Sequence, residues 1–221
     1  MSNITPSLRL VVITLVVGCV VASLTGATAK GAPGDNGLKI AVVNPARLII
    51  ESKFYKAETD KLQKLQQDTQ LRIRTWDQNS LLSQTDQQSL ADLTIDEGGK
   101  AGLDAGKKAE KQKLLDRGKA LFDESVALQT KANLAQNEQD RLREFARLDA
   151  DTKQREQAEA TKIKSQIDTK LAEVRDATDK SARDSLNKIA KKDGYNMVFS
   201  SEVLLYADND ITDKVVGDIN K

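Results

Sequence analysis

The segment GLDAGKK, at residues 102–108, is the first place where residue types and spacing suggest chemistry. A Walker-type phosphate loop has four residues between two glycines, followed by Lys and then Ser or Thr. Here the spacing is one residue short, no Ser or Thr follows the lysine, and no strand pattern precedes the loop. Four glycines within residues 96–106 are typical of a turn or hinge, which is the interpretation we adopt.

Catalytic side chains are scarce in the rest of the chain. There is no His, and the single Cys is Cys19, whereas metal sites and nucleophilic catalysis need His, Cys or an activated Ser. Carboxylates are abundant, but on charge-rich helices they are typical of solvated surfaces. The sequence therefore predicts a protein that is not an enzyme and has no cofactor or metal. A balance of 34 basic and 33 acidic residues also argues against nucleic-acid binding.

Two groups of side chains could bind a partner. A basic cluster, which could attract an anionic partner or a membrane surface, follows five acidic residues at 86–104 and comprises Lys107, Lys108, Lys111, Lys113, Arg117 and Lys119. Sparse apolar side chains could contact a non-native chain weakly at many points, and the candidates are Leu62, Leu65, Ile73, Trp76, Phe122 and Phe145. The structural alternatives are a solvated helix face for the basic cluster and helix–helix packing for the apolar residues.

Residues 1–29 are predicted to be a secretory signal peptide, because Arg9 precedes an apolar run that ends in small residues at Ala29. The run has about 15 residues, whereas a membrane-spanning helix needs about 20. Two alternatives are lipoprotein processing before Cys19 and an uncleaved anchor. Cleavage after Ala29 leaves 33 basic and 33 acidic residues and no Cys, so disulfides cannot stabilise the exported chain.

The remaining sequence divides by pattern into a small body and a long arm, which together predict an α+β fold that is mostly α. We expect a flexible leader at residues 30–37, a body strand at 38–44, a helical hairpin arm at 45–192 with a break near 98–106, and two body strands with a C-terminal helix at 193–221. The two strands are expected at residues 196–200 and 203–207, and Asp210 is expected to cap the final helix.

Local signals place several helix ends within the arm. Asn44 before Pro45 is typical of a helix start, and Gly194 is typical of a helix end. Ser83 followed by Asp86 resembles a capping box, which predicts one helix ending near residue 79 and another starting at 84. Residues 45–97 and 107–192 would span about 80 Å and 130 Å as straight helices. Either the second helix bends, with Gly118 as one candidate, or the region near Ser83 folds back.

The body is too small to bury its apolar residues alone. Residues 38–44 and 194–221 together make 35 residues, and units below about 40 residues usually need disulfides, metal or oligomerisation. With no His and no Cys in the exported chain, we expect oligomerisation. The expected contact residues are Ile40, Val42, Val198, Phe199, Leu204, Leu205, Tyr206, Ile211, Val215 and Ile219.

The two ends of the exported chain resemble a known family. The segments KIAVVN and AKKDGYNMVFSSEVLLYADNDITDKVVGDIN are similar to those of the OmpH/Skp family of periplasmic chaperones. This resemblance implies a jellyfish-like homotrimer in the periplasm, whose arms enclose a cavity and hold unfolded outer-membrane proteins without ATP. It also implies that the six apolar candidates face the bound outer-membrane protein. The sequence departs from the family in its neutral charge and its longer arm. The neutral charge argues against a general attraction to anionic lipid, so we expect at most a weak contact with the membrane surface.

The neutral charge and the long arm also fit a second hypothesis. In it the chain is a structural coiled-coil envelope adaptor or a spacer, anchored by a lipid on Cys19. This hypothesis predicts a folded partner and a modified N-terminus, whereas the chaperone hypothesis predicts unfolded partners.

Overall fold

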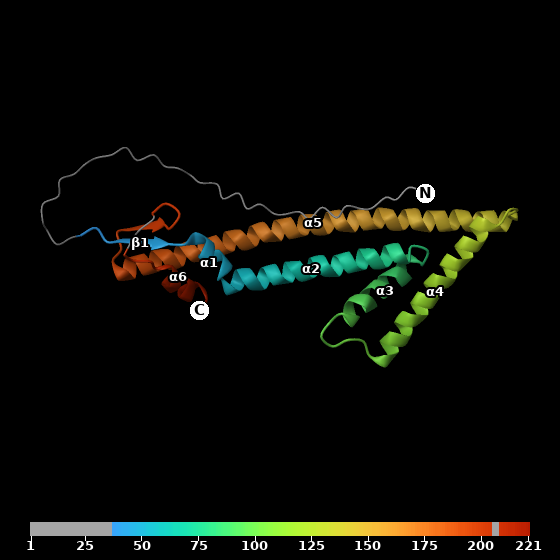
Figure 1. The fold of residues 1–221 in the computed structure, drawn as a ribbon, viewed down its shortest axis with the longest axis horizontal. Helices are drawn as coiled ribbons and strands as arrows, with labels where there is room; N and C mark the ends of the chain where they lie inside the picture. The colour runs from blue at the N-terminus through green and yellow to red at the C-terminus, as the bar shows by residue number, and fades with distance from the viewer. Residues whose placement is uncertain (1–36, 205–207) are drawn as a thin grey trace, which may run out of the picture. The chain divides into compact units, whose positions relative to one another are not determined.

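The computed structural model describes residues 37–204 and 208–221, which form an α+β fold that is mostly α, as predicted (Figure 1). The strands and helices follow in the order β1 (Ile40–Val43), α1 (Pro45–Ile50), α2 (Lys53–Gln78), α3 (Gln84–Glu97), α4 (Ala105–Thr130), α5 (Gln136–Asp193), β2 (Met197–Ser200) and α6 (Thr212–Ile219). Residues 1–36, which contain the expected signal peptide and Cys19, lie outside the described residues.

β1 and β2, which are far apart in sequence, meet in a two-stranded parallel sheet. β1 pairs with β2 in a register that places Ile40 opposite Met197 and Val43 opposite Ser200. On its other side β1 bonds to the segment before α6, because Val42 donates its N–H to the Asn209 carbonyl at 2.8 Å and accepts from the Ile211 N–H at 3.0 Å. Everything between the two strands must therefore leave the body and return to it.

The expected third strand at 203–207 is wrong where the structure describes it. Val203 and Leu204 lie at a turn, and their N–H groups donate to the Ser200 carbonyl at 3.0 and 3.1 Å. The remaining residues of that strand, 205–207, lie outside the described residues. On the edge of β1 that faces away from β2, Val42 instead forms an isolated parallel bridge with Asp210.

A small apolar core joins the sheet to the ends of the arm. Its buried members are Ala41, Val43, Leu48, Ala182, Ile189, Ile211 and Val215. They come from β1, α1, α5 and the region of α6, so segments from both ends of the sequence contribute to one cluster. The prediction that Asp210 caps the final helix is wrong by one residue, because the N-cap of α6 is Ile211. Asp210 nevertheless accepts a hydrogen bond from the Thr212 N–H at 2.8 Å, next to the start of α6.

The first helix of the arm is shorter than the sequence indicated. Asn44 caps α1 through its side-chain oxygen, which accepts from the Arg47 N–H at 3.1 Å, as predicted. The expected continuous helix from Pro45 is wrong, because α1 ends at Ile50 and α2 restarts with Ser52 as its N-cap. The C-terminal Asn220 stabilises this interruption, donating to the Glu51 carbonyl at 2.8 Å and accepting from the Lys53 N–H at 2.7 Å.

Three reversals shape the middle of the arm. The chain folds back near Ser83, which caps α3 through the Asp86 N–H at 3.2 Å, so α3 packs against α2 (Figure 1). This selects the fold-back alternative, and Gly118 lies within the single helix α4. The second reversal lies between Glu97 and Ala105, at the predicted break near 98–106. The third reversal, between α4 and α5, was not predicted. It depends on Glu138, which accepts from the Ala135 N–H at 3.0 Å and from Lys131 Nζ at 2.7 Å.

Large apolar side chains around the body predict that the chain is an oligomer. Five of them have between 47% and 75% of their surface exposed in the single chain: Leu38, Ile50, Phe54, Met197 and Val203. Exposed apolar groups concentrated in one region usually mark an interface. Sedimentation equilibrium of the exported chain should therefore give a multiple of the single-chain mass. A folded, concentration-independent monomer would contradict this prediction.

Candidate functional site

The surface available for binding is set by the packing of α2 against α5, which lie side by side in Figure 1. The seam between them buries threonines among its apolar residues. Thr69, Thr75 and Thr178 each donate their hydroxyl to the carbonyl four residues earlier in their own helix, at 2.7–2.8 Å. Because their polar groups are satisfied locally, these side chains can be buried at low cost. The seam therefore combines polar side chains that are satisfied locally with buried apolar ones.

Gln87 is the most extensively bonded side chain of the arm and is fully buried, with 0% exposure. It lies in the first turns of α3, facing the reversal after α2, whose last carbonyls have no partners within the helix. Its Nε2 lies within hydrogen-bonding distance of the carbonyl oxygens of Asn79, Ser80 and Leu82, at 3.0–3.1 Å, and of Thr152 Oγ1, at 3.0 Å. Its Oε1 accepts from Arg155. Gln87 therefore fixes the reversal onto α5.

Trp76 and Arg155 form the neighbouring part of this junction. The Arg155 guanidinium lies 5.3 Å from the centre of the Trp76 ring, within the range of a cation–π contact. Trp76 itself is only 6% exposed. This contact joins α2 to α5 near the C-terminal end of α2.

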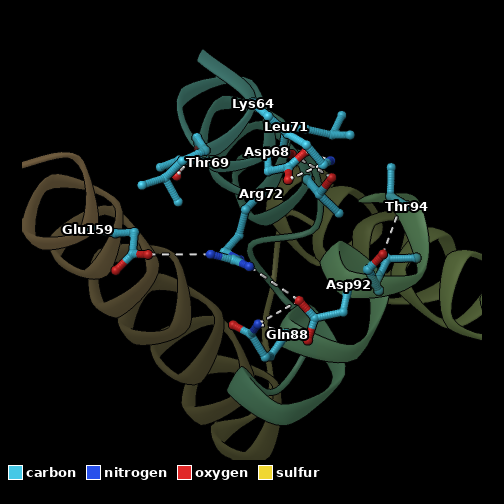
Figure 2. Close-up of polar contacts among 12 residues, drawn as sticks. Lys64, Asp68, Thr69, Leu71, Arg72, Gln88, Asp92, Thr94 and Glu159 are labelled. Carbon is cyan, nitrogen blue, oxygen red and sulfur yellow. Dashed lines mark hydrogen bonds and ion pairs between the residues drawn. The ribbon is translucent and has the colours of Figure 1, made fainter. Parts of the chain in front are cut away.

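Arg72, about one turn before Trp76 on α2, links three helices (Figure 2). Its guanidinium lies between Asp92 of α3 and Glu159 of α5, with nitrogen–oxygen distances of 3.5 Å to each. Gln88 also donates to Asp92, at 2.9 Å. At 3.5 Å these ion pairs are long, so Arg72 contributes mainly by balancing two carboxylates from different helices.

The six apolar candidates, all described by the structure, divide into two groups. Leu62, Leu65 and Ile73 are half-buried, and Trp76 and Phe145 are buried, so these five lie between helices. Phe122 is 61% exposed on α4. It borders a hollow of about 280 Å³ that lies where α4, α5 and the α2–α3 reversal meet and that also contacts Phe145.

The basic cluster has partners within the chain. Lys107, Lys111 and Arg117 on α4 pair with three acids of α3: Asp96 at 2.9 Å, Glu97 at 2.6 Å and Asp86 at 2.8 Å, respectively. Lys119 pairs with Asp123 one turn later, at 2.5 Å. The hydrogen bond to Asp96 raises the pKa of Lys107, and the hydrogen bond from Lys111 lowers the pKa of Glu97. These pairs reduce the attraction that the cluster would exert on an anionic surface. Lys108 and Lys113 are exposed on the same helix.

The expected oligomer contacts lie partly inside the body. Val42, Ile211 and Val215 are buried within the single chain. The half-buried members are Ile40, Val198, Phe199, Leu204 and Ile219. Leu205 and Tyr206 lie outside the described residues.

No helix in the described part of the chain is long and apolar enough to cross a bilayer. Within residues 37–204 and 208–221, no group of three or more His, Cys, Asp or Glu is arranged to hold a metal ion.

The family model described as outer membrane protein (OmpH-like) matches residues 39–219, from the start of β1 to the end of α6. The match spans the body and the entire arm. The chain belongs to the OmpH-like family. This family is one of periplasmic chaperones for outer-membrane proteins rather than of enzymes. No curated protein and no solved structure matches the chain.

The buried position of Gln87 predicts a large effect of its removal in this OmpH-like chain. Gln87→Ala leaves several carbonyls and Arg155 without their buried partner, so the free energy of unfolding of the arm should fall by about 2–3 kcal/mol. The neighbouring Gln88→Ala removes an exposed bond to Asp92 and should change it by less than about 0.5 kcal/mol. Urea unfolding monitored by the fluorescence of Trp76 would measure both. Equal effects of the two substitutions would contradict the assigned role.

Proposed function

We propose that this chain is an ATP-independent holdase of the periplasm, which binds unfolded outer-membrane proteins in a cavity between the helical arms of a homotrimer. The observation that carries the proposal is the OmpH-like match, which extends over residues 39–219 and so includes both the body and the arm. Cleavage of residues 1–29 would deliver the chain to this compartment, and residues 30–37 would act as a leader.

The surface of the arm supports binding to non-native chains. On α4, Leu115, Phe122 and Val126 are 37%, 61% and 43% exposed, and charged side chains separate them. Isolated apolar side chains each contribute little binding energy, but an unfolded protein can contact many of them at once. Such binding is reversible without a chemical step, as a carrier that lacks an ATPase requires.

The body supports assembly. Its core of seven buried residues is small, and the exposed apolar side chains named above lie around it. Packing them against further copies of the body would bury surface that a single chain leaves in water. Three arms held by one assembled body would define a common cavity, in which the contacts of each arm add to those of its neighbours.

Aggregation assays test this proposal directly. The purified chain, confirmed to be folded and assembled, should suppress the aggregation of a urea-diluted β-barrel protein at near-stoichiometric ratios, and ATP should not change the result. A folded soluble protein at the same concentration serves as the control. Failure to suppress aggregation by the intact assembly would contradict the proposal. It would favour the envelope adaptor or lipid-anchored spacer, which is expected to retain a folded partner and a modified N-terminus.

A further inference from the structure

Helix α4 has an unusually small buried anchor. Of its 26 residues, all described by the structure, Ser125 alone is buried, and it is polar. The side of α4 that faces the rest of the arm carries the half-buried Leu114, Leu121 and Leu128. By comparison, α5 buries eight side chains, among them Phe145, Ile163 and Val174. Segments with few buried apolar contacts open at low free energy, so α4 is the long helix that is most easily detached.

Ion pairs make up most of the specific contacts that hold α4. Its N-terminal half is joined to α3 by Lys107–Asp96, Lys111–Glu97 and Arg117–Asp86, at 2.6–2.9 Å. Its C-terminal half is joined to α5 by Glu124, which accepts two hydrogen bonds from Arg141, at 2.8 and 3.0 Å. Such pairs at a partly exposed surface are individually weak and are screened by salt.

The surface beneath α4 contains large buried apolar side chains among polar ones. Gly118 lies against the α2–α3 reversal, where a Cβ on it would be 2.7 Å from Asn79 Oδ1 and 3.7 Å from a methyl group of Leu82. Leu82 is 1% exposed and Phe145 is 3% exposed, and the Arg141 guanidinium lies 4.4 Å from the centre of the Phe145 ring. The hollow beside Phe122 opens onto this same surface. Detaching α4 would expose Leu82 and Phe145, which are buried in the closed arm, as an accessible apolar region.

We propose that α4 is a salt-sensitive cover, which conceals this apolar region in the resting arm and swings away to let it contact unfolded polypeptide. The inference rests on the proposed holdase function and identifies a regulated part of its binding surface. Closed, the cover protects the arm from self-association through Leu82 and Phe145. Open, it supplies contacts that the isolated exposed residues of α4 cannot provide. Charged segments of an unfolded chain can compete for the ion pairs and so promote opening.

Hydrogen exchange of the full chain tests the cover without any partner. Between about 0.01 M and 1 M NaCl, the Debye length falls from about 30 Å to about 3 Å, so exchange in residues 105–130 should become about tenfold faster. Exchange in α2 should change much less. The double substitution Asp96→Asn and Glu97→Gln should reproduce this acceleration at low salt. Glu173→Gln, which removes the Lys170–Glu173 pair on α5, is the matched control and should leave α4 unchanged. Salt-independent exchange of α4, as slow as that of α2, would overturn the proposal.

A disulfide lock tests the link to binding. A Cβ at position 118 would lie 3.7 Å from Asn79 Cγ, the atom that the sulfur of a cysteine at position 79 would replace. We therefore choose Asn79→Cys with Gly118→Cys to bridge α4 to the reversal, in a Cys19→Ser background that removes the native thiol, and mass spectrometry should confirm that the bridge forms. The oxidised double variant should lose most of the suppression of β-barrel aggregation, and reduction of the same sample should restore it. Equal suppression in both states would overturn the cover. Failure of the unlocked wild-type chain to suppress aggregation would instead contradict the holdase function, while hydrogen exchange still decides whether α4 opens.

Discussion

The parallel pairing of β1 with β2 is the interaction on which the rest of the structure depends. It places Ile40 beside Met197 and thereby closes a loop of more than 150 residues into a body with a small core. Closing so long a loop has an entropic cost that one short pair of strands cannot offset alone. Further contacts help to offset this cost. Asn220 bonds to Glu51, Thr212 bonds to Asn44, and apolar side chains pack around Val215.

The arm follows a different design from the body. Its seam relies on threonines bonded to their own helices, on the buried amide of Gln87 and on charge pairs such as Arg72 with Glu159, rather than on a continuous row of large apolar side chains. A seam of this kind keeps the helices packed together and leaves few apolar side chains exposed on the surface. For the proposed holdase, such a surface would allow many weak contacts and would limit association between arms.

Several helix ends that depend on neighbours in sequence were predictable, whereas the contacts between distant segments were not. The α4–α5 reversal was missed although it is local, because its N-cap Ala135 has no capping side chain. Asn44, Ser83 and Gly194 marked helix ends correctly, because capping is decided within three or four residues. The break after Ile50 was missed, and it combines a local cap, Ser52, with bonds to Asn220 that the sequence could not reveal. The role of Gln87 was missed for a related reason, since a polar residue in a charged helix gives no sign that it is buried. The basic cluster was visible in the sequence, whereas its pairing with α3 required the fold-back to be known.

The central claim is that unfolded proteins contact the arm while the body assembles the chain. Site-specific photo-cross-linking tests it most directly, with a photoreactive amino acid at Phe122 on α4 or at Val203 beside β2, two positions that are 61% and 75% exposed. We predict that an unfolded β-barrel protein is captured from position 122, and that position 203 yields cross-links between copies of the chain. Capture of the unfolded protein from position 203 but not from position 122 would contradict the account.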